Sequence, residues 1–133
     1  MEGIMSNKKK SKILIVEDEP VFRLIYRGVL EKEGYEVLEA EDGVQGLKLI
    51  KQEMPDLVLL DLILPRMTGY EVLDKIRADN SVRKIPVIVL SVLGGEENVE
   101  KALGLGVCQY RVKGDSSPTN ILSVIKDMLD DGK

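Results

Sequence analysis

Short, uninterrupted apolar runs recur along the chain, and a polar or charged residue follows each of them. Residues 13–16 precede Glu17, residues 57–60 precede Asp61, and residues 87–90 precede Ser91. Runs of this length without polar alternation are typical of strands that are buried on both faces, as strands of parallel sheets are. The runs therefore restrict the chain to an α/β fold with a covered sheet.

Helical patterns separate these runs. Apolar residues recur at helical spacing over residues 22–30, 44–54, 70–76 and 96–105, and Pro118 opens a last helix. Strands are expected at 12–16, 35–39, 57–60, 86–90 and 107–112, with 35–39 at an edge of the sheet. Strand and helix thus alternate with short connections, which predicts a parallel sheet with helices on both faces and right-handed crossovers.

A chain of 133 residues is long enough for one domain with one core. Residues 1–11 are polar and lack any period, so we interpret them as a disordered leader. Residues 12–131 are expected to form the single folded domain.

The chain contains no histidine, which excludes several kinds of site. Ser-His-Asp and Cys-His catalytic arrangements are impossible, and so is a metal bound by histidine. Any metal must be bound by oxygen ligands, which favours magnesium, calcium or manganese.

The net charge of -4 disfavours nucleic acid or an anionic membrane as the main partner. The one cysteine, Cys108, cannot form an internal disulfide, and we interpret it as a packing residue near the start of the last strand. No segment has the apolar length of a transmembrane helix or the pattern of a signal peptide. We therefore expect a cytoplasmic protein that binds neither membrane nor nucleic acid directly.

Chemically capable side chains follow the expected strands at their carboxyl ends, where open parallel sheets bind ligands. They are Glu17, Asp18, Asp61, Ser91 and Lys113. Three neighbouring carboxylates repel one another, and a hard divalent cation such as Mg²⁺ removes this conflict. Asp61 is then a candidate nucleophile for phosphoryl transfer, with Lys113 and Ser91 as ligands of the phosphoryl oxygens. The alternative is an incidental cluster of surface charges at loop ends.

Four segments together carry a resemblance to a known family. They are residues 13–19 (ILIVEDE), 59–73 (LLDLILPRMTGYEVL), 89–91 (VLS) and 110–113 (YRVK). In this order they resemble the receiver domain of two-component response regulators, within the chemotaxis-regulator-like superfamily, and the likeness extends over residues 12–129. The resemblance implies a flavodoxin-like, doubly wound, five-stranded parallel sheet of order 2-1-3-4-5 with five helices.

The resemblance also implies a function in phosphorelay signal transduction. Asp61 would accept a phosphoryl group from a histidine kinase or a histidine phosphotransfer protein, so the chain would be a signalling domain that catalyses only its own phosphorylation and dephosphorylation. Mg²⁺ would bind Asp18, Asp61 and the backbone carbonyl of Ile63, with Glu17 completing the acidic pocket.

Ser91 and Lys113 would bind the phosphoryl group, and Ser91 would act with Tyr110 as a conformational switch. The output partner, whose identity the resemblance does not give, would bind the face built by the fourth helix, the fifth strand and the fifth helix in chain order.

Two positions depart from the family pattern. Gly114 follows Lys113 where the family commonly has proline, and Val92 follows Ser91 where a small residue is usual. We expect Val92 to slow entry and loss of the phosphoryl group.

Three other functions remain open on the residues alone. A magnesium-dependent phosphohydrolase with an aspartyl nucleophile commonly has a second Asp two residues later, where this chain has Ile63. A carrier of flavin mononucleotide would need a phosphate loop after the first strand, where residues 17–19 are acidic. An interaction module that has lost phosphorylation is the third, and the retained Asp61 and Lys113 argue against it.

Overall fold

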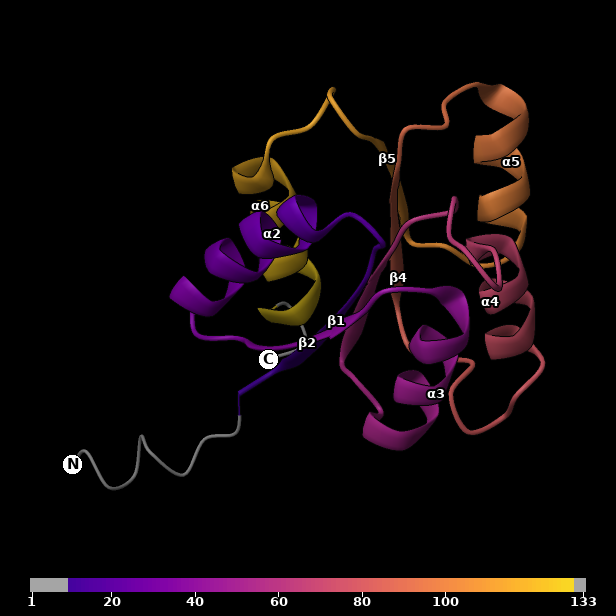
Figure 1. Cartoon of the computed structure of the whole chain (residues 1–133), viewed down its shortest axis with the longest axis horizontal. Coiled ribbons are helices and arrows are strands. Elements are labelled where there is room, and N and C mark those ends of the chain that lie inside the picture. The colour runs from indigo at the N-terminus through magenta and orange to yellow at the C-terminus, as the bar shows by residue number, and fades with distance from the viewer. Residues whose placement is uncertain (1–9, 131–133) are drawn as a thin grey trace.

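The structure is a computed structural model that describes residues 10–130. In these residues the chain alternates between five strands and five helices, as Figure 1 shows. In order, these are β1 (Lys12–Val16), α2 (Pro20–Lys32), β2 (Glu36–Ala40), α3 (Gly43–Glu53), β3 (Leu57–Leu60), α4 (Gly69–Arg77), β4 (Val87–Ser91), α5 (Glu96–Gly104), β5 (Gln109–Val112) and α6 (Pro118–Asp130). Most of the predicted leader lies outside the described residues, and so does residue 131.

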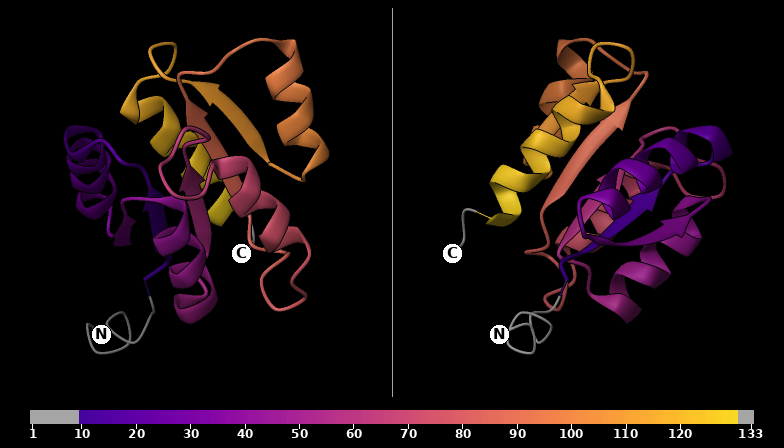
Figure 2. Two further views of the ribbon diagram at one scale, coloured as in Figure 1. Left: turned by 45° about the vertical axis from the view of Figure 1, so that its right-hand side comes forward. Right: turned by 90° about the vertical axis from the view of Figure 1, so that its left-hand side faces the viewer.

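All neighbouring strands are parallel, and their order is β2-β1-β3-β4-β5. This confirms the predicted flavodoxin-like sheet. Helices α2 and α6 cover one face of the sheet, and α3, α4 and α5 cover the other (Figures 1 and 2). None of the helices within residues 10–130 has both the length and the apolar character needed to span a membrane.

Two apolar layers explain why the central strands lack polar alternation. In β1, Ile13 and Ile15 pack with Tyr26 and Leu30 of α2, and the alternate positions Leu14 and Val16 pack in the other layer. Successive strand residues face opposite sides of a sheet, so a strand covered on both sides is apolar throughout. Every residue of β3 and β4 is buried in this way.

The loop after β3 folds back closely on itself before α4 begins. Thr68 caps this helix, because its hydroxyl accepts a hydrogen bond from the amide of Glu71 while the Glu71 carboxylate accepts one from the Thr68 amide. At Gly69 a Cβ atom would lie 2.3 Å from the carbonyl oxygen of Asp61, so only glycine fits without displacement of the backbone. The start of α4 thus packs directly against the backbone of the loop that contains Asp61, and the Gly69 amide donates to the Leu62 carbonyl at 2.9 Å.

Three strands depart slightly from the sequence-based prediction, and one of them is β4, which spans Val87–Ser91 where residues 86–90 were expected. β2 spans Glu36–Ala40 where residues 35–39 were expected, and β5 begins at Gln109 where residue 107 was expected. Cys108 therefore precedes β5, and its side chain is exposed. The interpretation of Cys108 as a packing residue is wrong, because the sheet edge leaves this position uncovered while its amide bonds to the carbonyl of Val87.

Candidate functional site

The carboxyl ends of three strands bring an amine between two buried carboxylates. Glu17 follows β1, Asp61 follows β3 and Lys113 follows β5. The Lys113 Nζ atom lies 2.7 Å from Oε1 of Glu17 and 3.1 Å from Oδ2 of Asp61. Glu17 and Asp61 are only 2% and 5% exposed. The structure thus brings together these three residues, which are far apart in the chain.

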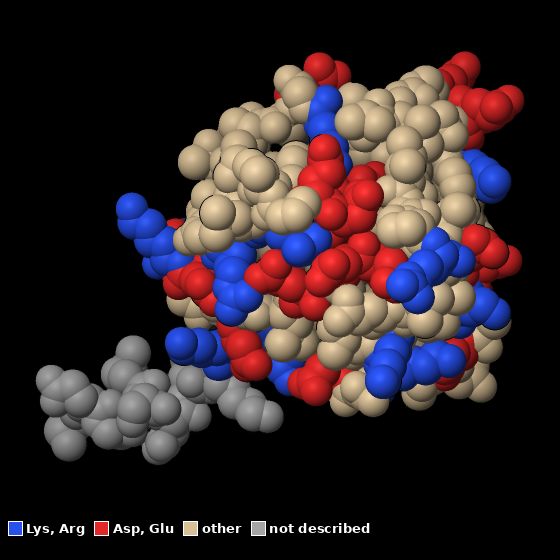
Figure 3. Space-filling view, in the orientation of Figure 1, with Lys and Arg blue, Asp and Glu red and all other residues tan. Residues whose placement is uncertain are grey.

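Asp18 completes a group of three acidic residues. Glu17, Asp18 and Asp61 each offer a carboxylate oxygen, and these oxygens all lie within 4.8 Å of one another. Figure 3 shows acidic side chains in a band across the middle of this face, with basic side chains on either side. A group of oxygen donors at this spacing fits a hard divalent cation such as Mg²⁺, which prefers carboxylate ligands.

A hollow of about 230 Å³ gives access to Asp61 from solvent. Its lining comprises Asp18, Glu19, Asp61, Ile63, Val92 and Lys113. Val92 is 60% exposed and is one of the residues that line this hollow. The hollow is large enough to admit a phosphoryl group together with water.

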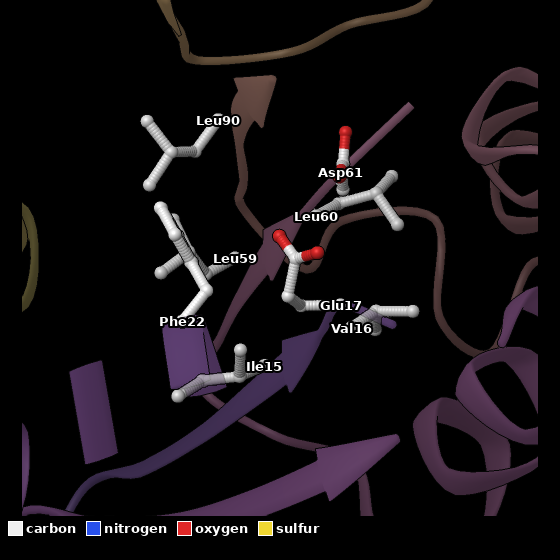
Figure 4. Close-up of a pocket in the computed structure, with 8 residues that line it drawn as sticks. All are labelled: Ile15, Val16, Glu17, Phe22, Leu59, Leu60, Asp61 and Leu90. Carbon is white, nitrogen blue, oxygen red and sulfur yellow. The ribbon is translucent and has the colours of Figure 1, made fainter. Parts of the chain in front are cut away.

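An apolar layer lies against the two buried carboxylates, and Figure 4 shows these side chains with Glu17 and Asp61 beside them. Its members are Ile15, Val16, Phe22, Leu59, Leu60 and Leu90. The pocket that they line with Glu17 and Asp61 has no volume for a water molecule. Glu17 is therefore poorly solvated on this side.

The poor solvation changes the acid–base properties of the site. Burial raises the pKa of Glu17 to about 7 and the charge of Asp61 acts in the same direction, although a hydrogen bond with Lys113 opposes them. Burial alone would lower the pKa of Lys113, but its bonds to Glu17, Glu19 and Asp61 outweigh this effect and raise it. Lys113 consequently stays cationic at neutral pH, whereas Glu17 titrates there.

Two contacts of Lys113 were not expected from the sequence. Its Nζ atom lies 3.1 Å from Oε1 of Glu19, and 4.2 Å from the centre of the Phe22 ring. The amide of Glu19 also donates a hydrogen bond to Oε2 of Glu17, at 3.1 Å. Glu19 belongs to the acidic run 17–19, which the sequence analysis identified. Phe22 was identified only as an apolar residue of a helical pattern, and nothing in the sequence predicted its contact with Lys113.

Each oxygen of the Asp61 carboxylate has its own partner. Oδ2 bonds to Lys113, and Oδ1 accepts a hydrogen bond from the backbone amide of Ile63 at 3.2 Å. The Ile63 side chain is 48% exposed at the hollow.

Gly114, the residue after Lys113, has a φ of 93°, a conformation that proline cannot adopt because its ring fixes φ near −65°. The loop after Lys113 therefore differs from one with proline at this position.

The two residues expected to form a switch contact the same backbone. Ser91 is fully buried, and its Oγ accepts a hydrogen bond from the amide of Leu93 at 3.4 Å. The Tyr110 hydroxyl donates to the carbonyl oxygen of Leu93 at 2.7 Å. Leu93, which the sequence-based reasoning missed, thus links Ser91 to Tyr110 through its two backbone groups.

Comparison with known proteins identifies one family. Residues 13–126 match the model of the family described as "Response regulator receiver domain". The probable transcriptional regulator ycf27 of Guillardia theta is 41% identical over 120 residues, which cover 90% of this chain and 46% of that protein. The chain spans about half the length of several transcriptional regulators that it matches.

Solved structures show the same architecture. A response regulator receiver domain protein (CheY-like) from Methanospirillum hungatei JF-1 superposes with a TM-score of 0.85 at 32% identity, over 92% of this chain and 96% of that one. The receiver domain of a sensor histidine kinase from Pseudomonas aeruginosa PAO1, which has a magnesium ion coordinated in its active site cleft, gives a TM-score of 0.80 at 28% identity. That match covers 89% of this chain and 96% of the other.

Proposed function

Because the chain belongs to the response regulator receiver domain family, we propose that its Asp61 accepts a phosphoryl group in a two-component phosphorelay. The observation that carries the proposal is the position of the Lys113 ammonium, 3.1 Å from Asp61 and 2.7 Å from Glu17, beside the exposed carboxylate of Asp18. This arrangement places a nucleophilic oxygen, a fixed positive charge and a set of oxygen ligands in one solvent-accessible hollow.

In the proposed reaction an Asp61 oxygen forms a bond to phosphorus while the bond from phosphorus to the donor's imidazole nitrogen breaks. The imidazole keeps the electron pair of that bond and takes up a proton. The Ile63 amide donates to one Asp61 oxygen and Lys113 to the other, so the orientation of the carboxylate is set before the donor arrives. The chain has no histidine, so the phosphohistidine must come from another protein.

Glu17, Asp18, Asp61 and the backbone carbonyl of Ile63 would hold Mg²⁺. The ion would supply positive charge against the phosphoryl oxygens. Lys113 keeps its proton, and its ammonium group pairs with the phosphoryl oxygens as a positive point charge. To do so it breaks its ion pair with Glu19 at the entrance of the hollow. The Ser91 hydroxyl would donate a hydrogen bond to a phosphoryl oxygen.

The Leu93 backbone supports a switch in which Ser91 and Tyr110 move together. If Ser91 turns toward the phosphoryl group, its hydrogen bond with the Leu93 amide is lost and the loop after β4 is free to shift. That shift also withdraws the carbonyl to which Tyr110 donates, and Tyr110 then turns inward. The surface of α5, β5 and α6 would transmit this change to an output partner.

Exposed apolar side chains on α2 and at the hollow support docking of a phosphodonor protein. Val21 and Leu24 on α2 are each 69% exposed, and Ile25 is 47% exposed. Ile63 and Val92 add further exposed apolar surface at the hollow itself. Apolar patches of this kind mark protein interaction sites, and we propose that a histidine kinase or phosphotransfer protein binds here in the cytoplasm.

Incubation with acetyl phosphate and magnesium, followed by intact-protein mass spectrometry, tests the proposal. Wild type should gain the mass of one phosphoryl group, and the gain should disappear with EDTA or in Asp61→Asn, which has nearly the same shape but is a poor nucleophile. A gain of mass by both proteins, or by neither, would contradict the assignment of Asp61. Hydrolysis of a phosphomonoester with turnover would support a phosphohydrolase in its place.

A further inference from the structure

One arginine on α2 joins the acidic loop to the neighbouring strand. The Nη1 atom of Arg23 donates a hydrogen bond to the carbonyl oxygen of Glu17 at 2.7 Å, and its Nε atom donates to Oε1 of Glu39 at 3.0 Å. Glu39 lies in β2, opposite Ile15 of β1. The Arg23 side chain is only 12% exposed, so these bonds are largely shielded from water. The guanidinium therefore fixes the residue after β1 against β2.

The bond to Glu17 matters most for the next residue, Asp18. The Asp18 carboxylate makes no hydrogen bond or ion pair with any residue in the range 10–130, although one of its oxygens lies within 4.8 Å of ligand atoms of Glu17 and Asp61. Its position consequently depends on the backbone that carries it. The peptide group between Glu17 and Asp18 contains the carbonyl that Arg23 holds, while the Glu17 amide donates to the Ala40 carbonyl at 3.0 Å. Arg23 therefore orients the peptide group from which the Asp18 side chain extends.

The positive charge of the Arg23 guanidinium also favours its position beside the acidic loop. Residues 17–19 are consecutive acids whose charges repel one another, and a buried positive charge against their backbone offsets this repulsion. The planar guanidinium offers donors in fixed directions and can bind two acceptors at once. Arg23 binds Glu39 directly at one end and the carbonyl of Glu17 in the acidic loop at the other. Arg27 pairs separately with Glu39 and Glu31 and makes no bond to the acidic loop within residues 10–130.

We propose that Arg23 is a positioning residue for the cation site, which sets the place of Asp18 by holding the carbonyl of Glu17. The inference rests on the proposed function, since it concerns the same cation. Arg23 does not contact the reacting atoms. Its replacement should therefore change the affinity for Mg²⁺ and leave the rate of the chemical step unchanged. Loss of a group that orients a metal ligand typically weakens metal binding by about 10-fold to 100-fold.

Isothermal titration of Mg²⁺ into wild type, Arg23→Gln and Arg27→Gln tests the inference. Arg27→Gln is the matched control, because it removes ion pairs to Glu39 and Glu31 and leaves the Glu17 carbonyl bonded. We expect Mg²⁺ to bind Arg23→Gln at least about 10-fold more weakly and Arg27→Gln as tightly as wild type. The Mg²⁺ concentration for half-maximal phosphorylation by acetyl phosphate should rise equally in Arg23→Gln, while its rate at saturating Mg²⁺ stays that of wild type.

Equal Mg²⁺ affinity in Arg23→Gln and Arg27→Gln would overturn the role of Arg23, as would a lower rate at saturating Mg²⁺ with unchanged affinity. If Arg23→Gln does not fold, Arg23→Lys takes its place; it keeps the charge but lacks the two directed donors, and it should also bind Mg²⁺ more weakly than wild type. Failure of wild type to bind Mg²⁺ would overturn the proposed function together with this inference. Binding that is equally tight in wild type and the Arg23 variants would overturn the inference alone.

Discussion

Replacing Glu17 with glutamine tests how the buried carboxylate contributes to stability. Burial raises the pKa of Glu17 from its ordinary value of 4.5 to about 7 in the folded protein without a bound cation. The folded state then binds a proton more tightly than the unfolded state does. Folding is therefore most favoured by this group below about pH 4.5, and the contribution is lost as the pH rises through about 7.

The size of the effect follows from the two pKa values. The difference between 4.5 and about 7 corresponds to about 3 kcal/mol of unfolding free energy between acidic and mildly alkaline solution. Glutamine has the same shape and no charge, so the Glu17→Gln variant should lack this loss. Lys113 retains Asp61 and Glu19 as partners in the variant, which keeps the remainder of the site paired.

Urea unfolding followed by far-ultraviolet circular dichroism, in EDTA and at a series of pH values, measures the effect. The difference in unfolding free energy between Glu17→Gln and wild type should increase by about 3 kcal/mol from about pH 4.5 to about pH 8. Titrating groups that do not interact with Glu17 contribute equally to both proteins and cancel in this difference. A difference that does not change with pH would show that Glu17 has the same pKa in the folded and the unfolded protein, and would refute the reasoning from burial.

Three further substitutions have expected outcomes. Gly28→Ala should raise the unfolding free energy in urea by about 1 kcal/mol, because Gly28 lies within α2 and a Cβ atom there meets nothing within 4 Å. Gly69→Ala should lower it by about 2 kcal/mol or more, because the added Cβ meets the Asp61 carbonyl oxygen at 2.3 Å. Val92→Ala should speed loss of the phosphoryl group, measured as the decay of phosphoprotein mass, and an unchanged decay rate would exclude a gating role for Val92.

The buried strands could be predicted from the sequence because burial on both faces leaves a plain signal. β1 and β3 have the predicted bounds, and β4 is shifted by one residue, to Val87–Ser91 from the predicted 86–90. The edge strand β5 was predicted less accurately, since a half-covered strand mixes apolar and polar residues. β5 has four residues of intermediate burial, and its predicted start at residue 107 included Cys108, which is exposed.

The convergence of Glu17, Asp61 and Lys113 could also be predicted, because parallel strands place their carboxyl ends along one edge. The contacts of Arg23 with Glu17 and of Phe22 with Lys113 could not. Both depend on the reach and rotamer of a helical side chain over a neighbouring strand end, which the spacing of apolar residues does not encode. The hydrogen bonds of the Leu93 backbone with Ser91 and Tyr110 were missed for a similar reason. Any residue type can form main-chain hydrogen bonds in a loop, so the sequence does not reveal them.

The identity of the phosphorylated residue tests the central claim most directly. An acyl phosphate is reduced by borohydride to an alcohol, which converts an aspartyl phosphate to homoserine, whereas a phosphoserine is unaffected. Tandem mass spectrometry of the protein treated with acetyl phosphate, magnesium and then borohydride should therefore locate homoserine at position 61. Phosphate that resists reduction and maps to Ser91, or homoserine at Asp18, would contradict the account.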